Sequence, residues 1–180
     1  MGGLMTRSVL LACCAMGAST SSFAATQGSV GATSTGSVSI SATVPGRVQI
    51  SGLTDLNFGT VDPAAAATST EDVCVWSNTS GKAYQITAAG SGAANAFTLT
   101  DGTNTLVYGI QWADSSGQSS GTELTSGTPL GAQVSTATNP TCSSGPTKTA
   151  SLIVNMSAAN LQAAAAGAYT GTLTLVVAPQ

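Results

Sequence analysis

The chain has 180 residues, with 4 Lys and Arg against 7 Asp and Glu, no His, and a net charge of -3. This length supports one domain with a real core and is too short for two large domains. The thin negative charge, without a basic cluster and with few aromatic residues, argues against nucleic acid as a partner, because nothing would neutralise phosphates or stack on bases. Abundant Gly, Ala, Ser and Thr with recurring turn signals are typical of an all-β domain.

The first residues are typical of a secretory signal peptide, which we expect to span residues 1–24. A basic start ending at Arg7 precedes the apolar run Ser8–Ala18, and Ser22-Phe23-Ala24 supplies the small residues that precede cleavage. The apolar run is shorter than the ~20 residues that cross a bilayer, which argues against a membrane anchor. A lipoprotein signal ending at Cys13 is the other alternative, although its apolar run of about five residues would be short.

The mature chain begins with a Gly-, Ser- and Thr-rich lead, Ala25–Gly36, which we expect to be flexible. It continues into Ser37–Val44, where apolar residues alternate with Ser or Thr, the pattern of a strand with one face on a core. Pro45-Gly46 then interrupts any ladder, and a second strand begins at Arg47. A strand set apart in this way could be given to a neighbouring molecule.

The rest of the chain reads as short strands separated by turns, which favours a Greek-key β-sandwich. Only one segment is helix-prone, and we expect it to form a surface turn. We expect strands near residues 47–53, 56–61, 73–76, 83–88, 97–99, 106–112, 123–124, 130–134, 151–156 and 169–177, a small-residue loop at 62–70 and the surface turn at 158–166.

The last expected strand has two distinct faces. Leu173, Leu175 and Val177 alternate and therefore share one face, while the intervening residues share the other.

The signal segment would remove Cys13 and Cys14, which leaves Cys74 and Cys142 in the mature chain. An even pair in an oxidising compartment is most simply one disulfide, with two free buried thiols as the alternative. Two thiols without any His cannot complete a metal site, so we expect neither a metal nor another cofactor.

Conventional catalytic chemistry is hard to build from this sequence, and we expect no enzyme. Without His there is no conventional Ser or Cys triad, and the acidic residues are scattered through loops rather than paired. The aromatic residues could line a sugar-binding face, but they lie in strand-like apolar runs and are expected to pack in the core or a groove. They are Trp76, Tyr84, Tyr108, Trp112 and Tyr169.

Three segments and the signal peptide together resemble the subunits of chaperone–usher pili, in particular the archaic and spore-coat-U-like families. These segments are Ser37–Pro45, Leu56-Asn57-Phe58-Gly59 and Gly167–Leu175, and the resemblance covers essentially the whole mature chain. The cysteines depart from the spore-coat-U-like pattern, which would place one near Ile50.

The resemblance implies an immunoglobulin-like Greek-key sandwich that lacks its last strand. A periplasmic pilus chaperone would fill the resulting groove, and at the outer-membrane usher the N-terminal strand of the next subunit would replace it, building a fimbria at the cell surface that supports adhesion or biofilm formation. Residues 25–45 would be the extension that carries the donor strand, and residues 46–180 the pilin-like domain. The inserted side chains would be Val38, Ile40, Ala42 and Val44, and the strand bordering the groove would present Leu173, Leu175 and Val177.

Two other functions remain open from the sequence. A tip adhesin or lectin-like module would share the fold and bind a host or surface ligand through its loops. A self-complete secreted protein, either of the spore-coat type or an enzyme, would use residues 37–44 as its own first strand.

Overall fold

The structure is a computed structural model that describes residues 24–180, so nearly all of the expected signal segment lies outside the described residues. The chain divides into two units, Met1–Val44 and Pro45–Gln180. Among the described residues no helix is both long and apolar enough to cross a membrane.

The described part of the first unit is extended chain with one local pairing. Thr26 N–H donates to the Ser37 carbonyl at 2.8 Å, and Ser37 N–H donates back to the Thr26 carbonyl at 2.9 Å. Apart from the bridge at Ser37, residues 37–44 are not in a strand, and Val38, Ile40 and Val44 are 72%, 90% and 81% exposed. The alternating pattern is therefore present without a ladder, because a strand needs a partner edge and residues 38–44 have none within the described part of their unit.

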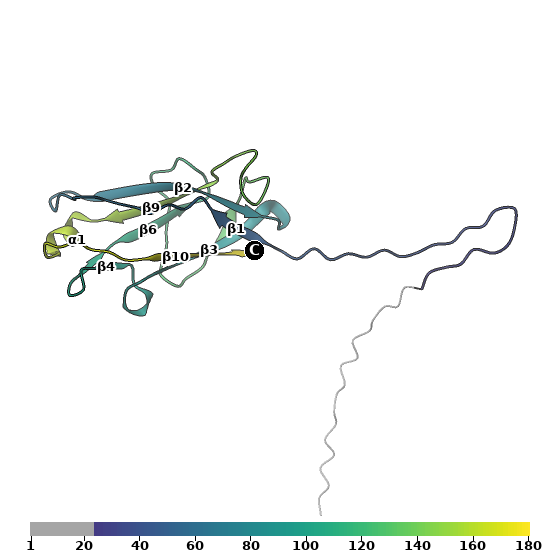
Figure 1. The fold of residues 1–180 in the computed structure, drawn as a ribbon, viewed down its shortest axis with the longest axis horizontal. Helices are drawn as coiled ribbons and strands as arrows, with labels where there is room; N and C mark the ends of the chain where they lie inside the picture. The colour runs from purple at the N-terminus through teal and green to yellow at the C-terminus, as the bar shows by residue number, and fades with distance from the viewer. Residues whose placement is uncertain (1–23) are drawn as a thin grey trace, which may run out of the picture. The chain divides into compact units, whose positions relative to one another are not determined.

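The second unit confirms the expected all-β fold as an antiparallel sandwich of two sheets. Figure 1 shows β2, β9 and β6 in one layer, with β10 and β3 opposite. The larger sheet has the order β1 (Val48–Ser51), β2 (Ala67–Ser77), β9 (Ala150–Met156), β6 (Gly109–Ala113), β7 (Thr122–Glu123), and the smaller has the order β10 (Leu173–Pro179), β3 (Ala83–Gly90), β8 (Leu130–Val134). A separate hairpin joins β4 (Thr98–Thr100) to β5 (Thr105–Val107).

Several boundaries differ from the sequence prediction, for identifiable reasons. β2 begins at Ala67, inside the expected loop 62–70, because its polar residues pair in register with the apolar strand β9. The expected strand 106–112 is split at Tyr108 into β5 and β6, which pair with different partners. No strand forms at residues 56–61, and the segment before Leu173 makes only one bridge, between Thr170 and Thr100.

The expected surface turn at 158–166 contains a short helix, α1 (Ala158–Ala163). Ser157 caps its first turn by accepting a hydrogen bond from Asn160 N–H at 3.1 Å. Leu161 is buried and anchors the helix to the core. One cap and one apolar anchor thus suffice for a helix in the Ala-rich segment.

The core lies between the sheets and is centred on Trp112 and Tyr84, both fully buried. Trp112 Nε1–H donates to the Tyr84 hydroxyl oxygen at 3.1 Å, which satisfies both buried polar groups. Burial raises the pKa of Tyr84 to about 12, so the phenol is neutral in the physiological range.

A smaller cluster surrounds the disulfide at one end of the larger sheet. The structure joins Cys74 to Cys142, with their Cα atoms 6.1 Å apart. Trp76 and Ala137 pack against this bond. The disulfide therefore ties a long loop to the half of β2 that is paired with β1.

A candidate strand-accepting groove

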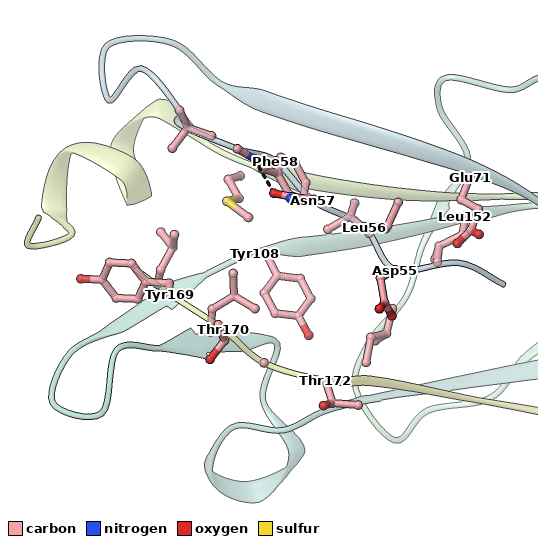
Figure 2. Close-up of a pocket in the computed structure, with 18 of the residues that line it drawn as sticks. Asp55, Leu56, Asn57, Phe58, Glu71, Tyr108, Leu152, Tyr169, Thr170 and Thr172 are labelled. Atoms are coloured by element: carbon pink, nitrogen blue, oxygen red, sulfur yellow. Dashed lines mark hydrogen bonds between the residues drawn. The ribbon is translucent and has the colours of Figure 1, made fainter. Parts of the chain in front are cut away.

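A groove of about 870 Å³ opens between the two layers of the sandwich. Figure 2 shows Tyr169 and Thr170 at one end, and Asp55 and Glu71 at the other. Side chains from both layers line it, and most of those pointing inward are apolar. These apolar side chains are Leu53, Leu56, Phe58, Val61, Leu99, Leu106, Tyr108, Leu152, Val154, Met156, Tyr169, Leu173 and Leu175.

The strand β10 forms the wall of the groove on the smaller sheet. Leu173, Leu175 and Val177 are half-buried and pack on the core, while Val176 faces outward and is 56% exposed. Of the three inward residues, Leu173 and Leu175 line the groove, and Val177 packs on the core beyond it.

The outer edge of β10 carries no strand in the part of the chain that the structure describes, because β10 ends the order of its sheet. Thr172 N–H donates to Ser91 Oγ at 3.0 Å and Gln180 N–H to the Ala83 carbonyl at 3.4 Å, so the even-numbered residues direct their main-chain groups toward β3. Alternate residues of a strand direct these groups to opposite edges. The N–H and C=O groups of Leu173, Leu175 and Val177 therefore point to the open edge.

The opposite wall is the segment 53–61, which follows β1. β1 pairs only with Cys74–Ser77, so within residues 24–180 no strand pairs with the first half of β2 on that edge. Leu56, Phe58 and Val61 cover the core from this segment without entering a ladder. Its bend is fixed where Asn57 Oδ1 accepts a hydrogen bond from Gly59 N–H at 2.8 Å, and Gly59 has φ +62°, which favours glycine.

The floor of the groove is supplied by β9 and by the residue between β5 and β6. Leu152, Val154 and Met156 present apolar side chains from β9. Tyr108 adds its ring and packs against Phe97 with ring centroids 5.8 Å apart. Burial raises the pKa of Tyr108, so this phenol adds no charge to the floor at neutral pH.

The groove also contains a buried acid that the sequence analysis did not assign to it. Glu71 is 9% exposed and lines the groove beside Leu53 and Thr54. One sequence signal could have found it, because Glu71 is in phase with the inward residues Val73 and Val75 of the same strand. Its place at the end of a polar stretch obscured that pattern.

The structure does not assemble the aromatic residues into a sugar-binding face. Tyr84 and Trp112 are fully buried, so their rings are not available for stacking on a ligand, and Tyr108 lies in the floor of the groove. Trp76 packs on the disulfide cluster and Tyr169 lines the groove. No group of three His, Cys, Asp or Glu side chains suited to a metal ion occurs within residues 24–180.

No family model and no curated protein matches this chain. Among solved structures, the chain is similar to one in the CsuC–CsuE chaperone–tip adhesion subunit pre-assembly complex from archaic chaperone–usher Csu pili of Acinetobacter baumannii. The two chains are 19% identical, with a TM-score of 0.39, and the match covers 75% of this chain. It spans 40% of the matched chain's length.

Proposed function

We propose that this protein is a structural subunit of a surface fimbria, assembled by donor-strand complementation along the chaperone–usher route. The observation that carries the proposal is an apolar groove beside the unpaired edge of β10, in a chain that also carries an exposed alternating segment. In this proposal a second copy of the chain supplies residues 37–44 as the missing strand. The protein acts by assembly and performs no catalysis.

The segment and the groove match in length. From Val38 to Val44 there are six residue steps, the same number as from Tyr169 to Leu175 along the groove. At about 3.3 Å per residue, each spans roughly 20 Å when extended. Four alternate side chains of the segment can therefore enter the groove, and these are Val38, Ile40, Ala42 and Val44.

The energetics favour such a joint. Each larger apolar side chain removed from water contributes roughly 1.5–3 kcal/mol before ordering costs. The inserted strand also gains main-chain hydrogen bonds to the open edge at Leu173, Leu175 and Val177. An empty groove would leave an apolar surface beside an unpaired edge, which promotes aggregation, so a periplasmic chaperone is the partner we expect before assembly. An outer-membrane usher and neighbouring subunits complete the expected set of partners.

The experiment compares assembly of the mature chain with two variants of the donor segment. The first deletes residues 25–44, and the second is Ile40→Asp, which would place a charge in an apolar groove at a cost of several kcal/mol. Both should abolish fibre formation, measured by electron microscopy and by size in dilute detergent. Both should still take up a synthetic peptide of residues 35–46, because their own groove is intact.

Ser39→Asp is the matched control. Position 39 lies on the opposite face of the same segment, so the same charge should face solvent and leave assembly nearly unchanged. Normal fibres from the deletion or from Ile40→Asp would rule out the donor role. The protein would then be better explained as a self-complete surface domain.

A further inference from the structure

Glu71 differs from the other polar side chains of the groove because it is buried. Its Oε1 accepts hydrogen bonds from the N–H of Thr54 and, at 2.6 Å, from the Thr54 hydroxyl. Its Oε2 is also buried, and no described residue donates a hydrogen bond to it. The neighbouring Asp55, which also lines the groove, is exposed.

Among the described residues no cation forms a hydrogen bond with Glu71, because Thr54 supplies both donors to Oε1 and Oε2 has none. The Lys148 ammonium donates to the Gly52 carbonyl at 3.2 Å. A buried oxygen without a hydrogen-bond donor costs free energy, and more so when the group is charged. An occupant of the groove that brings a hydrogen-bond donor to Oε2 would remove this cost. A purely apolar occupant would exclude water and leave Oε2 without a donor.

We propose that Glu71 is a recognition residue of the groove, whose Oε2 accepts a hydrogen bond from a main-chain N–H of the strand inserted by a second copy of this chain. This inference rests on the proposed function. A strand that bonds to β10 through one edge directs the N–H groups of its other edge away from β10, toward the wall that contains segment 53–61 and Glu71. The hydroxyls of Ser37, Ser39, Ser41 and Thr43 lie on the face opposite the inserted side chains, so the donor to Oε2 is a main-chain N–H.

Such a contact would select the occupant and its register. The remaining inward contacts of the groove are mostly apolar and tolerate a strand shifted by two residues, since shifting by two restores the same face. A single buried acceptor near one end of the groove favours the register that places a donor against it. Glu71 would thus distinguish a correctly seated strand from a slipped one.

The test measures binding of a peptide of residues 35–46 to the full mature chain carrying Ile40→Asp, which prevents its own segment from competing. Glu71→Gln in this background should weaken binding about tenfold or more, because Gln replaces one acceptor oxygen by an NH₂ group. Glu123→Gln is the matched control. It makes the same substitution at an exposed residue of β7 that does not line the groove, and it should change binding less than about twofold.

The outcomes separate this inference from the proposed function. If the wild-type peptide binds no better than a peptide carrying Ile40→Asp, the proposed function fails, and the inference with it. If the wild-type peptide binds and Glu71→Gln binds it within twofold of the parent, the function stands and the role of Glu71 is overturned.

A second measurement needs no substitution at Glu71. The chain contains only two glutamates, Glu71 and Glu123, so selective ¹³C labelling of Glu carboxyl groups gives two resonances. Glu123 is exposed in β7 and serves as the internal control. Adding the peptide should move the Glu71 resonance alone. In a set of peptides that are each N-methylated at one residue between 37 and 41, one peptide should give a smaller movement, because it lacks the N–H that donates to Oε2. A resonance that stays still, or that moves equally with every peptide, overturns the inference.

Discussion

The two halves of β2 have opposite surroundings. In the second half, Cys74–Ser77, β1 pairs with one edge, and on the other edge Val75 exchanges buried hydrogen bonds with the Thr149 hydroxyl, at 2.8 and 3.0 Å. In the first half, Ala67–Val73, β9 pairs with one edge and no described strand pairs with the other. We call the end of the sandwich at Cys74–Ser77 the closed end, because both edges of β2 have partners there. The end at Ala67–Val73, where one edge of β2 has no described partner strand, is the open end.

The contacts that stabilise the fold and the groove that could accept a strand lie at different ends of the sandwich. The closed end holds the disulfide and buried hydroxyl bonds, including Ser135 Oγ to the Val75 carbonyl at 2.5 Å. The open end holds the groove, which Glu71 lines from this half of β2. Changes at the closed end should mainly alter the free energy of unfolding, and changes at the open end should mainly alter binding of a strand.

The largest expected effect comes from a charge in the open end. Leu175→Asp would place a carboxylate against the apolar lining, where an unpaired ion costs several kcal/mol. We expect at least about a thousandfold weaker binding of the 35–46 peptide, loss of the complex with a chaperone, and degradation of the subunit in the periplasm. Calorimetry and co-purification measure these effects.

Val176→Asp is the control for that change, because it puts the same charge on the outward face of the same strand. It should alter stability by less than about 0.5 kcal/mol and leave peptide binding intact. Leu175→Asp protein that still accumulates as a soluble chaperone complex would show that the groove beside β10 is not the contact site.

The next largest effect should come from the closed end. Replacing both cysteines with Ala should lower the free energy of unfolding by about 4 kcal/mol, since the bond closes a loop with a sequence separation of 68 residues. Urea denaturation with and without reductant measures this. Peptide affinity of the folded protein should stay within about twofold if the two ends are independent. A parallel loss of affinity would contradict the separation.

Much of this architecture could be predicted from the sequence, because alternation is a local signal. The inward set Leu173, Leu175 and Val177 needed only the period of a strand. The same pattern did not show that residues 38–44 are unpaired, since alternation distinguishes the two faces of a strand and does not identify the strand that pairs with it.

The parts of the groove that were missed depend on tertiary contacts. Residues 56–61 look like a strand, but Gly59 at positive φ turns the chain and the segment becomes a wall. Glu71 looked like a solvated acid because Ala67–Asp72 is polar, and only pairing with β9 turns its side chain inward. The bend at Gly59 is local but is not visible in the apolar pattern, whereas the pairing of β2 with β9 depends on residues about 80 positions away.

A smaller effect should reveal which edge of the inserted strand faces β10. If Leu173, Leu175 and Val177 offer the open main-chain groups, only alternate N–H groups of the peptide can bond to them. N-methylation at Ile40 and at Ser41 should therefore weaken binding unequally, with about tenfold loss where the N–H faces β10. Equal losses at both positions would show that the peptide does not add to β10 as a strand.

The smallest effect concerns Asp72, on the outward face where the two halves of β2 meet. Its Oδ1 accepts hydrogen bonds from Ser151 Oγ at 2.6 Å and from Gly117 N–H at 2.8 Å, and these bonds, the Ser151 one foremost, hold the pKa of Asp72 below its usual range. A carboxyl with a lowered folded-state pKa stabilises the fold above its unfolded pKa of about 3.9, and this contribution is lost as the pH falls through the folded value.

Asp72→Asn should therefore lower the free energy of unfolding by less than about 1 kcal/mol at pH 7, because the site is largely open to solvent. The difference between Asp72→Asn and wild type should shrink as the pH falls below about 4. Urea denaturation of both proteins between pH 7 and pH 3 measures this difference in the free energy of unfolding. Asp62→Asn, at an exposed position outside the strands, serves as the reference. A difference that grows toward acid would mean that the protonated form of Asp72 is the one the fold prefers, opposite to what its two hydrogen-bond donors require.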